Sequence, residues 1–255
     1  MTIKFVSINL LHGGTFLDNI LKFLREQDAD IVIMQEAYNS TDPTLAKQFR
    51  SMQVLDEELH YPYNDFVAAF RDMDRTEGKA QIGNALLSRF PISGRDSVFF
   101  FEGYSDGAYR DVPGNYQNCP RVLEHVTMET PVGDIDVFNI QGVWDLNGER
   151  YSDQRKHMAD IVIEQVSGKE RVILGGDTNA KTDNQCIKDI EEHLHSVFGS
   201  ELTSTFNMRH KDNPGYATAA VDMIFVSPTI QVLAKDCPED DVSDHKPLTA
   251  TFEVH

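Results

Sequence analysis

The sequence predicts an α/β fold in which β-sheets stack on each other and helices cover the outer faces. Short apolar segments recur along the 255 residues and outnumber the segments with helical periodicity. Many strands flanked by few helices are typical of stacked sheets with the helices outside. No linker rich in Pro, Gly and Ser divides the chain, so we expect a single domain over residues 1–255.

The first half of the chain begins with an apolar strand over residues 3–9. Apolar residues at helical spacing predict a helix over residues 15–27, with Thr15 as its N-cap, and a second helix over residues 43–59. Shorter apolar segments between and after these helices predict strands. They lie at residues 31–34, 65–70, 84–88, 98–101, 121–128 and 134–140.

The second half contains two more segments with helical spacing, at residues 152–166 and 187–194. The continuous apolar run at 171–174 is typical of a strand that is buried on both faces. Three further strands are expected at the end of the chain. They cover residues 221–226, 230–234 and 248–254.

The composition excludes several classes of protein. The 41 acidic and 23 basic residues give a net charge of -18, which opposes non-specific binding to duplex nucleic acid. No apolar stretch approaches the length of a membrane helix, and the amino terminus resembles a strand more than a signal peptide. The three cysteines are far apart, which argues against a disulfide framework or a thiolate metal site. We therefore expect a cytoplasmic protein, and we expect it to be a monomer.

Polar residues stand at the ends of several predicted strands. A charge beside a buried strand must be paired or must bind a metal, because burial of an isolated charge is costly. Several such strand ends in one region of a sheet would make an oxygen-rich pocket. The residues concerned are Asn9, Glu36, Asp177, Asn179, Asp222, Asp244 and His245.

The side chains in this set suit a hard metal ion. They are carboxylates, amides and an imidazole, with no thiolate, which favours Mg²⁺ or Mn²⁺ over zinc. Asp177 and His245 can take part in proton transfer near neutral pH, and a carboxylate such as Asp222 can orient the imidazole.

Each residue also has a purely structural interpretation. Glu36 can begin a loop after its strand, Asp177 can form an Asx turn within GGDTN, and Asp244 can be a loop or cap residue. The other histidines, His12 among them, are expected to be surface or hydrogen-bonded polar residues. Trp144 is expected in packing or in the wall of a pocket.

In chain order, these motifs resemble the endonuclease/exonuclease/phosphatase superfamily, which includes pancreatic-type deoxyribonucleases, abasic-site endonucleases, neutral sphingomyelinases, inositol polyphosphate phosphatases and deadenylases. The resemblance extends over residues 3–254. It is specific because GGDTN, VDMIF and SDH occur in the family's order and spacing. The matching motifs are SIN ending at Asn9, MQE ending at Glu36, GNALLSRFPI at 83–92, RV at 121–122, FNIQGVW at 138–144, ERYSDQR at 149–155, GGDTN at 175–179, VDMIFVS at 221–227 and SDHKPL at 243–248.

The resemblance implies a particular form of the α/β fold. It is a four-layer α/β/β/α sandwich, with two mixed β-sheets packed face to face and the helices outside. The resemblance also implies a metal site in which Glu36 is the main ligand. Asn9 and Asp244 would complete or support this site.

The resemblance further implies roles in catalysis and substrate binding. Asp177 would orient or deprotonate the attacking water, and Asn179 would hold the scissile phosphate. His245, paired with Asp222, would contact the phosphate or act as the general base. Arg121 lies where some members of the family contact a phosphate.

Gln141 departs from the family pattern. Many members have N-x-H where this chain has Asn139-Ile140-Gln141, and the usual histidine stabilises charge on the phosphoryl group. A glutamine in its place can donate a hydrogen bond, but it carries neither a charge nor a transferable proton. We include Gln141 among the expected catalytic residues.

Together these features predict a Mg²⁺-dependent phosphoesterase, with Mn²⁺ as the second choice of metal, that hydrolyses a phosphodiester by in-line attack of water. The expected substrate is a single-stranded or small nucleic acid, or a small or lipid phosphodiester. Two alternatives are a phosphomonoesterase on the same scaffold and a catalytically impaired binding protein. Gln141 is the sole support for the impaired protein.

Overall fold

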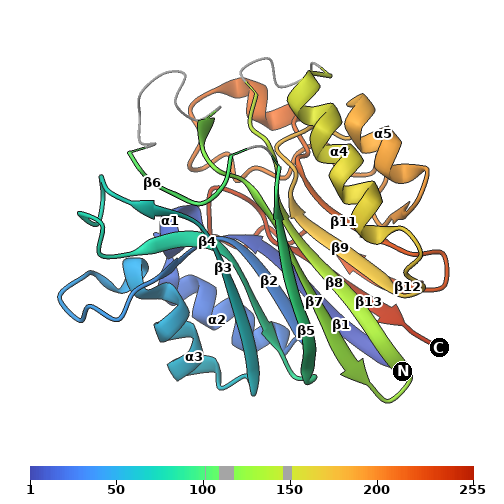
Figure 1. The fold of residues 1–255 in the computed structure, drawn as a ribbon, viewed down its shortest axis with the longest axis horizontal. Helices are drawn as coiled ribbons and strands as arrows, with labels where there is room; N and C mark the ends of the chain where they lie inside the picture. The colour runs from blue at the N-terminus through green and yellow to red at the C-terminus, as the bar shows by residue number, and fades with distance from the viewer. Residues whose placement is uncertain (101, 109–117, 146–150) are drawn as a thin grey trace.

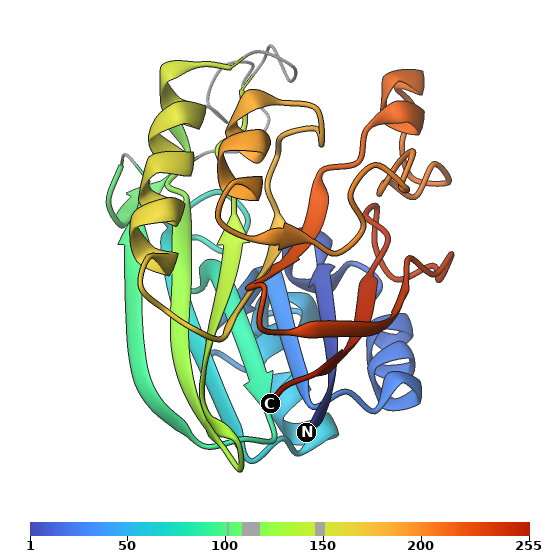
Figure 2. The same cartoon turned by 90° about the vertical axis from the view of Figure 1, so that its right-hand side faces the viewer.

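The structure is a computed structural model that describes residues 1–100, 102–108, 118–145 and 151–255. Two β-sheets pack face to face, with helices on their outer sides (Figure 1). In Figure 2, helices α4 (Asp153–Val166) and α5 (Gln185–Glu191) flank one side of the stack, and α2 (Leu17–Gln27) lies on the other. The predicted four-layer sandwich is confirmed.

The first sheet has seven strands in the order β12-β13-β1-β2-β4-β3-β6. Strand β1 is parallel to β2 and β3 is parallel to β6, whereas the other neighbours are antiparallel, so the sheet is mixed. The parallel pair brings Asn9 beside Gln35. The strands are β1 (Thr2–Asn9), β2 (Ile31–Asn39), β3 (Tyr63–Asp72), β4 (Gln81–Ser88), β6 (Ser105–Gly107), β12 (Gln231–Asp236) and β13 (Leu248–Glu253).

The second sheet has six strands in the order β10-β11-β9-β8-β7-β5. Strands β8 and β9 are parallel, and their register places Gln141 opposite Asp177. Strand β11 is antiparallel to β9 and places Asp222 opposite Asp177 on its other side. Three predicted site residues therefore lie abreast on neighbouring strands. The strands are β5 (Ile92–Phe99), β7 (Val122–Thr130), β8 (Gly133–Gln141), β9 (Val172–Asp177), β10 (His195–Ser196) and β11 (Asp222–Val226).

Three apolar layers hold the sandwich together. Alternate residues of both sheets, such as Phe5, Val137 and Phe252, form the layer between the sheets. Helices α2 and α3 (Ser51–Leu59) cover the outer face of the first sheet, and α4 and α5 cover that of the second. Each fully buried large apolar side chain stabilises the fold by about 1.5–3 kcal/mol.

A buried polar cluster around Asn139 interrupts the apolar layer between the sheets. Asn139 Oδ1 accepts a hydrogen bond from Gln35 Nε2 over 2.7 Å. Its Nδ2 lies 3.0 Å from the carbonyl oxygens of Met34 and Ala85, and 2.8 Å from Glu124 Oε2. Asn139 thus links the second sheet to β2 and β4 of the first by hydrogen bonds. It lies two residues before Gln141, the predicted site residue at the end of β8.

The amino-terminal helix differs from the sequence prediction. A short helix, α1 (Leu11–Gly14), comes first, and α2 then begins with Phe16 at its N-cap. The prediction of Thr15 as the cap is wrong, because its hydroxyl donates to the Leu11 carbonyl over 3.0 Å.

The helix predicted over residues 43–59 is wrong in its first part. The segment contains a short 3-10 helix, η1 (Lys47–Arg50), and then α3. The Asp42 carboxylate accepts hydrogen bonds from the N–H and the hydroxyl of Thr44, at 2.9 and 2.6 Å. These bonds close a turn and compete with a helix start.

The predicted strands are present, and most are longer than expected. The strand predicted at 98–101 is the end of β5, and residue 101 lies outside the described residues, as do the first two residues of the motif at 149–155. Strands β6 and β10 and the 3-10 helix η3 (Pro214–Thr218) are not predicted. Within the described ranges, every helix is too short or too polar to cross a membrane.

Candidate active site

A cavity of about 270 Å³ lies at the strand ends of the two sheets. Seven of the nine predicted site residues line it, and the remaining two, Asn9 and Asp222, are hydrogen-bonded to residues that do. The prediction that strand ends from distant parts of the sequence meet in one pocket is therefore matched by the fold. The lining residues are Leu11, His12, Glu36, Arg121, Gln141, Trp144, Asp177, Asn179, Phe206, Lys211, Tyr216, Asp244 and His245.

A β-bulge directs Glu36 into this cavity. Glu36 lies within β2 and does not follow it, because pairing of β2 with β4 is interrupted between Met34 and Ala37. Its φ of 57° is in the left-handed region. Bulges re-aim a side chain, and strained backbone of this kind is concentrated at functional sites. The structural interpretation of Glu36 as the start of a loop is thus wrong.

The Glu36 carboxylate is held by three hydrogen bonds. Oε2 accepts from the backbone N–H of His12 over 2.9 Å. Oε1 accepts from Asn9 Nδ2 over 3.3 Å and from Gln141 Nε2 over 3.2 Å. Burial alone would raise the pKa of Glu36, but the charge and the backbone N–H of His12 lower it to about 2. Glu36 is therefore a fixed anion at neutral pH.

Asp177 occupies the end of β9, where the sheet leaves no room for a side chain at the preceding position. Gly176 has a φ of +134°, and a Cβ there would lie 2.1 Å from the Ile140 carbonyl oxygen. Asp177 Oδ2 accepts from Asn9 Nδ2 over 3.1 Å, and Oδ1 accepts from the Asn179 N–H over 2.9 Å. The Asx turn proposed for GGDTN is thus present, and the same side chain also lines the cavity.

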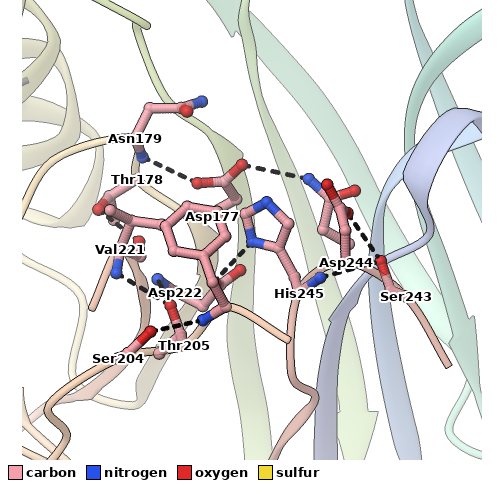
Figure 3. A network of polar contacts seen from close by, with 12 residues as sticks. Asp177, Thr178, Asn179, Ser204, Thr205, Val221, Asp222, Ser243, Asp244 and His245 are labelled. Atoms are coloured by element: carbon pink, nitrogen blue, oxygen red, sulfur yellow. Dashed lines mark hydrogen bonds and ion pairs between the residues drawn. The ribbon is translucent and has the colours of Figure 1, made fainter. Parts of the chain in front are cut away.

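His245 and Asp222 form a buried pair beside Asp177. His245 Nδ1 lies 2.8 Å from Asp222 Oδ2, and Figure 3 shows the other ring nitrogen on the side of Asp177. Burial alone would lower the pKa of His245, but the charge and hydrogen bond of Asp222, followed by the charge of Asp177, raise it to about 10. Burial raises the pKa of Asp177 to about 6, with opposing effects from His245 and Asp222.

Asn179 is positioned by a residue from the far side of the second sheet. Arg155 of α4 is fully buried and donates from Nη2 to the Asn179 carbonyl over 2.6 Å. Asn179 has a φ of 52°, and its side-chain Nδ2 donates to the Gly142 carbonyl over 3.0 Å. Hydrogen bonds to its backbone carbonyl and from its side chain therefore hold Asn179 in this left-handed conformation.

The cavity also contains three cationic side chains. Arg121 is 9% exposed, and its Nε has no hydrogen-bond partner among the described residues. Lys211 forms an ion pair with Asp244, whose second oxygen accepts from the Ser243 hydroxyl over 3.2 Å. With the raised pKa of His245, these cations give the cavity the charge that a phosphate needs, although the whole chain is strongly acidic.

Several residues of the cavity were not predicted. His12, which we expected at the surface or in an ordinary polar contact, lines the cavity with its ring 3.4 Å from Glu36. Lys211, Phe206 and Tyr216 enter from the long loop before β11, which carries no periodic pattern. Trp144 lines the cavity, in agreement with one of its two interpretations.

The donor set at this site fits a hard divalent cation. Asp177, Asp222 and His245 bring their potential ligand atoms within 4.8 Å of one another, and because His245 keeps its proton beside Asp222, the carboxylate oxygens are the donors of this group. Glu36 adds an ionised carboxylate whose side chain is 21% exposed. The cavity-lining residues that the structure describes supply oxygen and imidazole nitrogen and no thiolate, the pattern preferred by Mg²⁺ and Mn²⁺ over softer metals.

The two-sheet sandwich and this cavity of carboxylates, amides and cations define a hydrolase that acts on phosphoester bonds. A model of the Endonuclease/Exonuclease/phosphatase family matches residues 6–245. The chain belongs to this family, which is generally metal-dependent. Among curated proteins, none matches the sequence.

Solved structures of other proteins have a similar fold. An endonuclease/exonuclease/phosphatase from Beutenbergia cavernae has a TM-score of 0.78 at 19% identity, covering 99% of this chain and 72% of that one. A mannosyl-6-phosphatase from Bacteroides thetaiotaomicron has a TM-score of 0.70 at 20% identity, with 98% and 99% covered. The catalytic domain of human nocturnin has a TM-score of 0.72 at 18% identity, with 100% and 95% covered. At these identities, the likeness concerns the fold.

Proposed function

We propose that this protein is a Mg²⁺-dependent phosphodiesterase in which water attacks the phosphorus in line with the leaving oxygen. One observation carries the proposal. His245, held by the buried Asp222, lies beside Asp177, and both His245 and Asp177 share one cavity with Glu36 and Arg121. A base, charged donors and a fixed carboxylate within one small cavity are the groups that phosphoester hydrolysis requires.

Glu36 is the main metal ligand in this proposal, with Asn9 and Asp244 in supporting positions. Asn9 donates its amide hydrogens to Glu36 and Asp177, while its oxygen accepts from the Leu11 N–H over 3.0 Å. This geometry supports Asn9 as a residue that orients the carboxylates. When bound, Mg²⁺ would neutralise charge on the phosphoryl oxygens, and Mn²⁺ is the second candidate.

The proton chemistry follows from the two shifted groups. With a pKa of about 6, Asp177 is mostly ionised at neutral pH, which supports its role in orienting and deprotonating the attacking water. With a pKa of about 10, His245 is protonated at neutral pH, so it contacts the phosphate as a charged donor and does not serve as the base. Asn179, Gln141 and Arg121 hold the phosphoryl oxygens.

The substrate is proposed to be small or single-stranded. The net charge of -18 repels an extended polyanion at long range, whereas the cations are confined to the cavity. Single-stranded or short nucleic acids and small or lipid phosphodiesters satisfy this condition. We further propose a single-domain monomer in the cytoplasm, where the three free cysteines would remain reduced.

A phosphomonoesterase is the second candidate. Arg121, Lys211 and a protonated His245 converge on one cavity, and three cations suit the two charges of a monoester. The mannosyl-6-phosphatase of similar fold supports this candidate. A catalytically impaired binding protein is a third candidate that rests on Gln141.

One experiment separates these candidates. The purified protein is assayed with bis-(p-nitrophenyl) phosphate and with p-nitrophenyl phosphate, in Mg²⁺ and in EDTA. We expect Mg²⁺-dependent cleavage of the diester at the higher kcat/KM. Preference for the monoester would favour the phosphomonoesterase, and binding of phosphate without turnover of either compound would favour the impaired protein. A screen of oligonucleotides, lipid phosphodiesters and sugar phosphates would then identify the substrate.

A further inference from the structure

Lys211 is held at the wall of the active-site cavity by three contacts. Its ammonium forms an ion pair with Asp244, and its side chain is 19% exposed. The same nitrogen lies 5.0 Å from the centre of the Phe206 ring and 4.9 Å from that of Tyr216. Both distances are within the range of cation–π attraction. The rings and the carboxylate thus fix a flexible side chain that elsewhere would extend into solvent.

The loop that carries Lys211 is anchored to the segment around His245. The Asn207 N–H donates to the Asp244 carbonyl over 2.8 Å, and the Lys246 N–H donates to the Thr205 carbonyl over 2.7 Å. The Phe206 ring also lies 4.5 Å from the His245 ring, centre to centre. Lys211 and His245 therefore contact the same aromatic ring and belong to one wall of the cavity.

The ammonium has more donors than the protein uses. Three N–H groups are present, and Asp244 is the polar partner that the described residues show for Lys211. A mostly buried ion pair gives little net stability, because desolvation of both charges offsets their attraction. Stability is therefore a weak reason for a lysine at this place, whereas an anion in the cavity would satisfy the remaining donors.

Gln141, which lines the same cavity, brings no charge to a bound phosphate. Gln141 is neutral, and its Nε2 already donates to Glu36 over 3.2 Å. Charge on the phosphoryl oxygens rises during hydrolysis and is stabilised best by preorganised charged donors. Lys211 lines the same cavity of about 270 Å³ and brings to it an ammonium group that is paired with Asp244.

We propose that Lys211 is a phosphate-binding residue of this site, which donates to a non-bridging oxygen of the substrate phosphoryl group while remaining paired with Asp244. The proposal rests on the proposed function and extends it to substrate specificity. A phosphomonoester carries one more negative charge than a diester, so a third cation favours the monoester more. Lys211 would therefore set the ratio of monoester to diester turnover.

The first test measures binding of inorganic phosphate in EDTA by calorimetry, and so requires neither turnover nor metal. Lys211→Gln should weaken phosphate binding about 10- to 100-fold, the value of a hydrogen bond to a charged group. Lys246→Gln is the matched control, because Lys246 is also mostly buried, at 16% exposed, and pairs with Glu239 outside the cavity. It removes the same charge and should leave phosphate binding within about twofold of the unmodified protein.

The second test compares kcat/KM for p-nitrophenyl phosphate and bis-(p-nitrophenyl) phosphate. Lys211→Gln should lower both, with the larger loss on the monoester, and Lys211→Arg should restore most of each because it keeps the charge. If Lys211→Gln does not fold, Lys211→Met takes its place, because its unbranched side chain can still pack against Phe206 and Tyr216, and phosphate binding equal to that of Lys246→Gln overturns the proposal. Equal phosphate binding by Lys211→Gln and Lys246→Gln also overturns it. Absence of turnover in the unmodified protein would instead reject the proposed function.

Discussion

Asp222 determines the charge of His245. The Asp222 carboxylate faces Nδ1 of the imidazole at 2.8 Å, and the two side chains are only 4% and 9% exposed. An imidazole in this position keeps its proton at neutral pH, because a buried carboxylate stabilises the charged ring. The pair therefore presents a cation to the cavity and leaves Asp177 as the group able to accept a proton.

Removal of either member of this pair should reduce turnover without abolishing the fold. We expect His245→Ala to lower kcat by roughly 10²–10³, the usual contribution of a preorganised donor to the phosphoryl group. Asp222→Asn should lower kcat by a smaller factor, because the ring remains but loses its orientation and its charge. Steady-state kinetics at neutral pH would measure both effects. Full activity of Asp222→Asn beside an inactive His245→Ala would show that the pairing has no catalytic role.

The chain offers a matched control for these variants. His125 Nε2 lies 2.7 Å from Asp136 Oδ1 in a second, partly buried pair, and neither residue lines the cavity. His125→Ala should lower the melting temperature and leave kcat unchanged. A loss of kcat there comparable to that of His245→Ala would indicate that general destabilisation explains both.

The pH dependence of kcat/KM should be bell-shaped. Burial raises the pKa of Asp177 to about 6, so activity that needs the ionised carboxylate should rise with pH through this value. Despite its burial, the charge of Asp222 raises the pKa of His245 to about 10, so activity that needs the charged ring should fall above it. In Asp222→Asn, the alkaline limb should move to lower pH, toward the ordinary value of about 6.5. If the alkaline limb of Asp222→Asn stays at the same pH as in the unmodified protein, His245 is not the group that causes it.

Glu36→Gln should raise the Mg²⁺ concentration needed for half-maximal activity by at least about tenfold. The glutamine amide is neutral, whereas the His12 N–H helps to keep the Glu36 carboxylate ionised. Titration of activity with Mg²⁺ measures the change. Asp244→Asn provides the comparison, and its smaller expected shift follows from the pairing of Asp244 with Lys211. An unchanged Mg²⁺ requirement in Glu36→Gln would remove Glu36 from the metal site.

The sequence predicts best those site residues whose positions are set by the ends of the β-strands. Asp177 ends one apolar strand, and Asp222 begins another. Antiparallel pairing of these two strands places the two residues opposite each other. Glu36 lines the cavity, but not because its strand ends there. Strand β2 continues past it to Asn39, and a bulge, which apolar periodicity does not reveal, turns its side chain inward.

The remaining cavity residues depend on tertiary contacts that no local pattern encodes. Lys211 reaches the cavity because its loop pairs with the backbone around His245. Arg155 resembles any charged residue in the first turn of a helix, yet it is buried beneath Asn179. At residues 43–59 the local pattern instead predicts structure that is absent. Apolar residues recur at helical spacing, but the α-helix begins only at Ser51, because the Asp42 carboxylate closes a turn at the start of the segment.

Asn139→Ala should destabilise the fold more than a typical surface substitution. The change removes the hydrogen bonds that join the sheets and leaves Gln35 Nε2 and Glu124 Oε2 without this buried partner. Each buried polar group left unsatisfied costs about 1–3 kcal/mol, so we expect a loss of about 2–5 kcal/mol of unfolding free energy. Urea denaturation measures it. A loss below about 1 kcal/mol would mean that water replaces the lost contacts.

Gln141 allows the most direct test of how this site stabilises the phosphoryl group. Gln141 is 4% exposed, lies beside Asp177 in the sheet register, and donates to Glu36 over 3.2 Å. Its side chain can therefore act on the phosphoryl group through its remaining amide hydrogen and on the metal site through Glu36. Gln141→Ala should lower kcat, and loss of one preorganised donor typically costs about 10²–10³.

Gln141→His should act in the opposite direction. A protonated histidine donates a stronger hydrogen bond than an amide, so turnover of a simple diester should rise. The gain should fade as pH increases and the ring loses its proton, but Glu36 nearby should keep its pKa above the ordinary value of about 6.5. The measurement is kcat against pH for all three proteins, with Mg²⁺ at saturation so that changes at Glu36 do not contribute. If Gln141→Ala matches the unmodified protein on every cleaved substrate, Gln141 does not contact the phosphate, and charge must reach the phosphoryl group from elsewhere in the cavity.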